Sequence, residues 1–203
     1  MNQTIPPNAL AQAKEADSTQ PPLGALRFEM PQDLYAAIPQ LSELTQKRPM
    51  ADEDALDYLW RLRASTTPEE AVTYTAFAAL PQMAIWWAHE CLRLMPETLD
   101  QADLDMMENV GRWISAPNKD MRHQIMRQAL WASKRSPAVM LGLSVGWSGG
   151  SIAPNDPANV PVSRSPKSIN SAVLSSLAQA QLSRRSVLLA KIIDMAESLF
   201  RVY

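Results

Sequence analysis

The stretch TPEEAVTYTAFAALPQMAIWWAHECLR, residues 67–93, contains two helix patterns that meet at a single proline. Thr67 is a predicted N-cap, Pro68 suits the first helical position because no backbone N–H is needed there, and Glu70 completes a predicted capping box. Pro81 stops the first helix and opens the second. Because so few residues join the two helices, the sequence predicts an antiparallel helical hairpin.

The same succession of short helix patterns extends in both directions, and alternating strand patterns are nearly absent. Asp52 and Thr98 are predicted N-caps of the helices that follow them. The sequence therefore predicts an all-α fold, a single domain of antiparallel helical hairpins over residues 29–203. The helices are predicted over 32–38, 51–64, 68–80, 81–95, 99–114, 119–134, 138–147, 166–181 and 183–200.

Two segments break this succession. Residues 1–28 are biased toward Pro, Gln, Asn, Ser and Ala, which predicts a disordered N-terminal arm. Residues 148–166 contain four prolines and two glycines, a composition that predicts a long loop rather than a helix. A loop of this length inside a compact domain is usually functional or disordered.

The bulk composition narrows the function classes. The chain has 203 residues, 46% hydrophobic and 20% charged, as expected for one domain with a sizeable core. A net charge of −2 and the lack of a long basic run argue against nucleic-acid binding. Cys91 is the single cysteine, so no internal disulfide is expected and a reducing, cytoplasmic location is favoured. No Cys/His cluster has metal-ligand spacing, and neither a metal nor a cofactor is expected. No apolar run reaches the roughly 18 residues of a membrane span, and no secretory signal is recognised.

The segment GWSGGS, residues 146–151, spells the G-x-S-x-G motif of a serine hydrolase's nucleophile elbow. An elbow needs a strand before the serine and a helix directly after it, whereas Ser148 is followed by a Pro-rich stretch and by no histidine. The favoured interpretation is a turn at a helix C-terminus, in which Gly149 and Gly150 permit positive φ. An anion-binding nest formed by the backbone N–H groups of Ser148 to Ser151 is equally compatible with the sequence.

Two adjacent tryptophans, Trp86 and Trp87, point about 100° apart on a helix. Trp87 shares an apolar stripe with Cys91, which suits a core position. Trp86 shares its face with His89 and Arg93, and Trp and Arg are enriched in interface hot spots. The favoured interpretation is that both tryptophans are buried. The alternative is that Trp86, His89 and Arg93 form an exposed face for a protein partner.

A second candidate surface follows from His123, Arg127 and Trp131, which recur at intervals of four residues, with Arg135 next in the row. Such a basic stripe with an aromatic tip suits an acidic partner or a phosphopeptide. The favoured alternative is a solvated helix face with Trp131 turned inward.

Two stretches carry a resemblance to an uncharacterised bacterial family. Residues 67–93 resemble its first signature, a Thr-Pro-Glu-Glu-Ala start, a Leu-Pro step and an Ala-x-Trp-Trp-Ala helix followed by Cys91 and Arg93. Residues 147–154, WSGGSIAP, resemble its second signature, and the similarity spans about residues 30–190. The family's Ala-rich helix after the loop is more polar in this chain. Genes of the family are often found among type VI secretion clusters, so the resemblance implies a cytoplasmic accessory of a contractile secretion apparatus.

These expectations favour a non-enzymatic protein-binding accessory, an adaptor or chaperone whose partner is a secretion component or an effector. It would bind through the face around Trp86, the stripe around Trp131 or the turn at Ser148. An immunity protein that neutralises one toxin would use the same surfaces equally well. A serine hydrolase that acts through Ser148 is the least favoured of the three.

Overall fold

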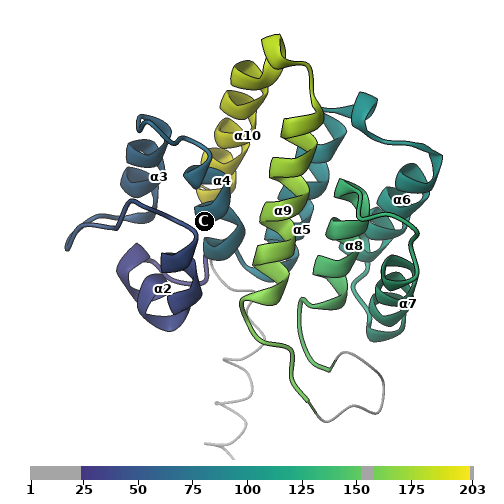
Figure 1. The fold of residues 1–203 in the computed structure, drawn as a ribbon. Helices are drawn as coiled ribbons and strands as arrows, with labels where there is room; N and C mark the ends of the chain where they lie inside the picture. The colour runs from purple at the N-terminus through teal and green to yellow at the C-terminus, as the bar shows by residue number, and fades with distance from the viewer. Residues whose placement is uncertain (1–23, 152–157, 202–203) are drawn as a thin grey trace, which may run out of the picture.

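Helices make up the regular structure of the computed structural model, which describes residues 24–151 and 158–201 (Figure 1). Within these residues, extended backbone pairs only at two isolated bridges, Leu26 to Ala79 and Ser151 to Asn159, so the predicted all-α fold is confirmed. None of the described helices is long and apolar enough to cross a membrane. The α-helices are α2 (Pro31–Ala37), α3 (Ala55–Arg63), α4 (Glu70–Ala78), α5 (Pro81–Arg93), α6 (Gln101–Ser115), α7 (Lys119–Leu130), α8 (Pro137–Gly146), α9 (Arg164–Gln179) and α10 (Arg185–Phe200). Short 3-10 helices are η1 (Pro39–Glu43), η2 (Pro96–Thr98) and η3 (Leu182–Arg184).

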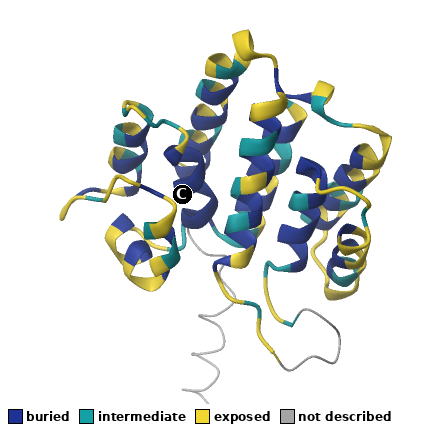
Figure 2. Cartoon of the chain, viewed as in Figure 1, coloured by how far each residue is buried: buried dark blue, intermediate teal, exposed yellow. Residues whose placement is uncertain are grey.

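Helix α8 is enclosed by its neighbours, with α9 on one side and α6 and α7 on the other (Figures 1 and 2). Its sequence, PAVMLGLSVG, is apolar on every face, and such a helix is stable only when it is covered all round. Two glycines allow the close approach of α6 and α7. A Cβ at Gly142 would lie 2.6 Å from Met106 Sδ, and a Cβ at Gly146 would lie 2.2 Å from Met126 Sδ.

Helix α9 meets α8 through buried serines. Ser165 Oγ donates to the carbonyl of Ser144 at 2.9 Å, and Ser168 Oγ donates to the carbonyl of Met140 at 2.6 Å. These side chains are short enough to let the two helices pack closely, and their hydroxyls are hydrogen-bonded, as buried polar groups must be. The polar character of α9 is therefore compatible with a buried position.

Helices α4 and α5 do not pack together as the predicted hairpin. Each of them packs against α9 more extensively than against the other. The backbone of Ala79 (φ −73°, ψ 150°) and Leu80 (φ −55°, ψ 144°) is extended. A proline excludes the helical conformation from the residue before it, so Pro81 enforces this break. Both helices are therefore free to contact α9, a segment far away in the sequence.

Two predicted N-cap residues differ from the structure. Helix α3 is capped by Asp54 rather than Asp52, and its carboxylate accepts from the backbone N–H groups of Leu56 and Asp57. Helix α6 is capped by Asp100 rather than Thr98, because Asp100 and Asp103 form a reciprocal capping box. In both cases the acidic residue closest to the first helical turn takes the cap.

Glu70 was expected to complete a capping box, but it is the first residue of α4 and its buried carboxylate bonds elsewhere. Its Oε2 accepts from the backbone N–H groups of Gln46 and Lys47, both at 3.0 Å. Its Oε1 accepts from Thr67 Oγ1 at 2.8 Å. Glu70 therefore ties the segment after η1 to the start of α4.

Replacing Glu70 with alanine should lower the free energy of unfolding by about 1–3 kcal/mol, because three donors lose their acceptor in a buried place. Urea unfolding followed by far-UV circular dichroism measures this change. Glu69→Ala is the matched control, since Glu69 is exposed and its variant should stay within about 0.5 kcal/mol of the natural protein. Equal losses from the two variants would show that the Glu70 contacts contribute nothing specific.

The last residues of the predicted arm and of the predicted loop are part of the ordered fold. The predicted arm included residues 24–28, but Leu80 N–H donates to the carbonyl of Ala25 at 2.7 Å and Arg27 N–H to the carbonyl of Ala78 at 2.8 Å. Residues 1–23 lie outside the described residues. The predicted loop included residues 164–166, but these form the first turn of α9. The backbone N–H groups of a first turn have no acceptor within the helix, so Pro166 is tolerated there. Of the remaining loop, residues 152–157 lie outside the described residues.

Candidate functional site

Trp86 and Trp87 have opposite surroundings on α5. Trp87 is fully buried and its Nε1 donates to the carbonyl of Ile192 on α10 at 3.3 Å. Trp86 is 39% exposed. The prediction that both are buried is therefore correct for Trp87 and wrong for Trp86.

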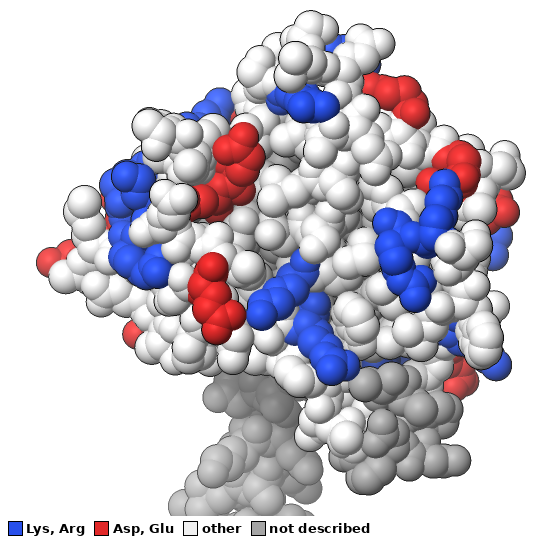
Figure 3. All heavy atoms as spheres, viewed as in Figure 1, with Lys and Arg blue, Asp and Glu red and all other residues white. Residues whose placement is uncertain are grey.

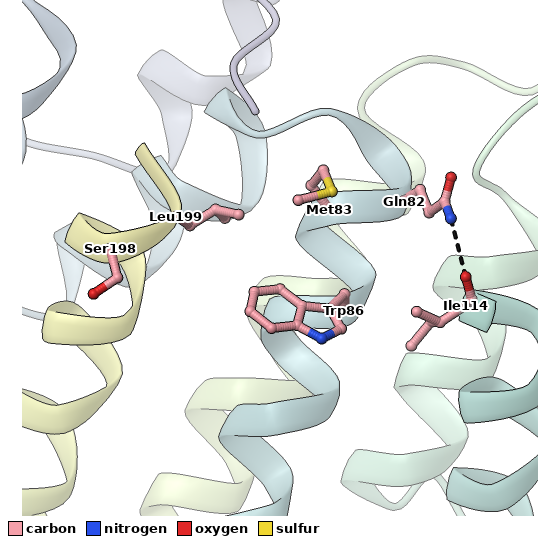
Figure 4. A pocket seen from close by; sticks show the side chains of 6 residues that line it. All are labelled: Gln82, Met83, Trp86, Ile114, Ser198 and Leu199. Atoms are coloured by element: carbon pink, nitrogen blue, oxygen red, sulfur yellow. Dashed lines mark hydrogen bonds between the residues drawn. The ribbon is translucent and has the colours of Figure 1, made fainter. Parts of the chain in front are cut away.

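An apolar groove surrounds Trp86, with a volume of about 330 Å³ (Figure 4). The indole ring lies in its centre, between the end of α10 on one side and the end of α6 on the other. Gln82 Nε2 donates to the carbonyl of Ile114 at 3.0 Å, which joins α5 to α6 at one edge. We call this site the Trp86 groove; it is lined by Gln82, Met83, Trp86, Ile114, Ser198 and Leu199.

The six lining residues include no charged side chain. Two carboxylates nearby are held in ion pairs, Glu197 with Arg201 at 2.8 Å and Glu90 with Arg93 at 3.0 Å. The hydrogen bond from Arg201 lowers the pKa of Glu197, so this carboxylate stays ionised and paired at neutral pH. The chemistry that the groove offers is therefore the burial of apolar side chains rather than proton transfer.

The predicted face of Trp86, His89 and Arg93 is not one surface. The His89 ring is mostly buried between α5 and α6, with Nε2 3.2 Å from the carbonyl oxygen of Met107 and Nδ1 3.1 Å from Glu90 Oε1. A Cβ at Gly111 would lie 3.5 Å from His89 Nε2, an ordinary van der Waals distance, so the ring packs directly against this part of α6. Arg93 is exposed and bound to Glu90. Of the three, Trp86 alone lines the groove.

The predicted stripe of His123, Arg127 and Trp131 does not form one continuous row on α7. The helix ends at Leu130, so Trp131 leaves the helix and is 85% exposed, which contradicts its predicted inward orientation. Arg135 does not continue the row, because its Nη1 turns back to the carbonyl of Ala129 at 3.0 Å. His123 is half-buried, with Nε2 3.0 Å from Arg122 Nη2, and Arg127 is exposed.

The GWSGGS segment is a turn that leaves a helix, as the favoured interpretation has it. Helix α8 precedes Ser148 where an elbow would need a strand, and Ser148 Oγ donates to the carbonyl of Val145 at 2.8 Å. Gly150 has a φ of +67°, whereas Gly149 does not adopt positive φ.

Arg122, which the sequence did not single out, braces this turn from α7. Its buried guanidinium donates to the carbonyls of Gly146 at 2.7 Å and Ser151 at 2.9 Å. Burial lowers the pKa of this guanidinium. Nothing in the local sequence distinguishes Arg122 from Arg127, the exposed arginine of the same helix.

The structure brings together groove residues that the sequence could not connect. Met83 lies one helical turn from Trp86, but Ile114 and Leu199 come from helices that are remote in the sequence. Each has the pattern of an ordinary core residue at a helix end.

Comparison with known proteins gives one match. A family model with the description "Family of unknown function (DUF6931)" matches residues 58–200, which is more than half of the chain. No curated protein and no solved structure matches the chain.

Proposed function

We propose that this chain, which belongs to the DUF6931 family, is a non-enzymatic protein-binding accessory that binds a partner protein at the Trp86 groove. The observation that carries this proposal is the exposure of Trp86 inside an apolar groove, beside a neighbour, Trp87, that is fully buried. A partly exposed tryptophan in an apolar hollow is the usual anchor of a protein interface.

The occupant we propose is one amphipathic segment of a protein partner, which places an aliphatic or aromatic side chain against the Trp86 ring. The groove volume of about 330 Å³ suits a few such side chains. Its lining is uncharged, and the neighbouring carboxylates of Glu197 and Glu90 are held in ion pairs, so the lining itself favours an apolar rather than a charged ligand. Helices that dock an apolar face into a groove are recognised in this way.

Two further elements of the proposal come from the family resemblance of residues 67–93 and 147–154. The partner is a component of a type VI secretion system or one of its effectors, and the chain acts as its adaptor or chaperone. A cytoplasmic location follows from that role.

Site-specific photo-crosslinking tests where the partner binds. A photoreactive residue at Met83, inside the groove, is expected to crosslink one protein in the host lysate. The same residue at Val187, an exposed apolar position on α10 outside the groove, is the control. The crosslink at Met83 should disappear when Trp86→Ala is added. A product that forms equally at Val187, or that survives Trp86→Ala, would rule out the groove as the binding site.

A further inference from the structure

A second surface lies at the end of α7, away from the residues that line the Trp86 groove. Four residues line a shallow hollow of about 470 Å³ there. All four are exposed, and the Trp131 side chain is 85% exposed. We call it the α7 surface; it consists of Gln124, Arg127, Gln128 and Trp131.

The α7 surface lies in a basic part of an acidic chain. Residues 119–135 hold five Lys or Arg residues and one acidic residue, Asp120, although the whole chain has a net charge of −2. On the face drawn in Figure 3, a group of Lys and Arg side chains lies at the right of the view, over the end of the molecule formed by α6–α8, with Asp and Glu side chains beside it. Within the described residues, Arg127 makes no ion pair, whereas Lys134 is held by Asp100. Arg127 is therefore a free cation beside an exposed indole.

On the α7 surface, the side chains of Gln128, Arg127 and Trp131 offer hydrogen-bond donors. Gln128 Oε1 accepts from Asn109 Nδ2 on α6 at 2.9 Å, which leaves the Gln128 amide nitrogen as the end that faces a ligand. Arg127 carries only donors, and the Trp131 indole nitrogen is a donor as well. Carboxylates are the protein groups that complement such a set, and their hydrogen bonds to arginine are among the strongest.

We propose that the α7 surface docks an acidic segment of a protein partner. One carboxylate of the segment binds the Arg127 guanidinium, and a neighbouring apolar side chain lies on the Trp131 ring. Charge complementarity selects the segment, and the exposed indole supplies the apolar contact. This surface acts independently of the Trp86 groove, because the two share no residue.

Fluorescence anisotropy with a synthetic probe tests this proposal. The probe is a fluorescein-labelled, glutamate-rich peptide with a central leucine–phenylalanine pair. The full chain is expected to bind it at low salt and to release it as salt rises. Arg127→Glu and Trp131→Ala should each weaken binding about tenfold or more. The matched control is Lys191→Glu on α10, an exposed lysine without an ion pair in the described residues, and it should change binding less than about twofold.

Three results would overturn the proposal. One is equal binding of a peptide in which every glutamate is replaced by glutamine. Another is an equal loss from Lys191→Glu, which would indicate attraction by net charge alone. The third is binding to anionic lipid vesicles without binding to the peptide. Trp86→Ala is expected to leave probe binding unchanged, so a failure of the Trp86 groove and a failure of the α7 surface are distinguishable.

Discussion

Trp87→Ala is expected to lower the free energy of unfolding by about 3–5 kcal/mol, the largest loss from a single side chain in this fold. The ring is fully buried between α5 and its neighbours, so its removal leaves a cavity that the rigid helices around it cannot fill. The variant also loses the hydrogen bond from Nε1 to the carbonyl of Ile192, the direct polar link from this side chain to α10.

Urea unfolding followed by far-UV circular dichroism measures this loss, and Trp86→Ala is the matched control on the same helix. Because Trp86 is 39% exposed, its replacement should cost no more than about 1–2 kcal/mol. Similar losses from the two variants would mean that the tryptophans do not differ in burial. That outcome would remove the reason for placing an interface at Trp86.

Gly146→Ala should destabilise the protein by about 1–3 kcal/mol, although alanine is the better helix former. In an isolated helix the substitution would gain about 1 kcal/mol. At Gly146, however, the new Cβ would lie 2.2 Å from Met126 Sδ and 2.7 Å from Met126 Cβ. Met126 can move its sulfur but not its Cβ, so α7 and α8 must separate.

The same unfolding measurement checks this prediction against Gly149→Ala, where nothing lies within 4 Å of an added Cβ. That control should stay within about 0.5 kcal/mol of the natural protein. A double variant with Met126→Ala should lose less stability than the sum of the two single losses, because the close contacts with Met126 Sδ and Cγ are removed and only the one with its Cβ remains. A stabilised Gly146→Ala protein would show that α8 is not packed closely against α7.

Local sequence patterns were sufficient for the fold class and for the positions of most helices. Pro81 marks a helix start because its effect on the backbone depends on its immediate neighbours alone. Cap residues were harder, because several acidic or hydroxyl residues compete at each start. The N-caps are Asp54 and Asp100, in place of the predicted Asp52 and Thr98.

Contacts between distant segments account for what the sequence did not predict. His89 is mostly buried because α6, a separate helix, packs against its ring, with Nε2 3.2 Å from the carbonyl oxygen of Met107. The Glu70 carboxylate accepts from the backbone N–H groups of Gln46 and Lys47 rather than capping its own helix. Trp131 is exposed because α7 ends one residue earlier, which no residue in its own stripe indicates.

The Trp86 groove could not be predicted from the sequence for the same reason. Periodicity separated the directions of Trp86 and Trp87 but could not tell which helices would cover each of them. The Trp86 groove exists because the ends of α6 and α10 meet α5 around one ring and leave it partly open. Such an opening depends on three segments at once, and no short pattern encodes it.

Calorimetric titration tests the central claim most directly. The partner that the crosslinking identifies is purified on its own, and its affinity for the Trp86→Ala protein is measured. Trp60→Ala is the matched control, because Trp60 is 40% exposed, lies on α3 and does not line the groove. The Trp86 groove predicts at least a roughly tenfold loss of affinity for Trp86→Ala and unchanged affinity for Trp60→Ala. Unchanged affinity for Trp86→Ala, in a protein that remains folded, would contradict the claim that this groove binds the partner.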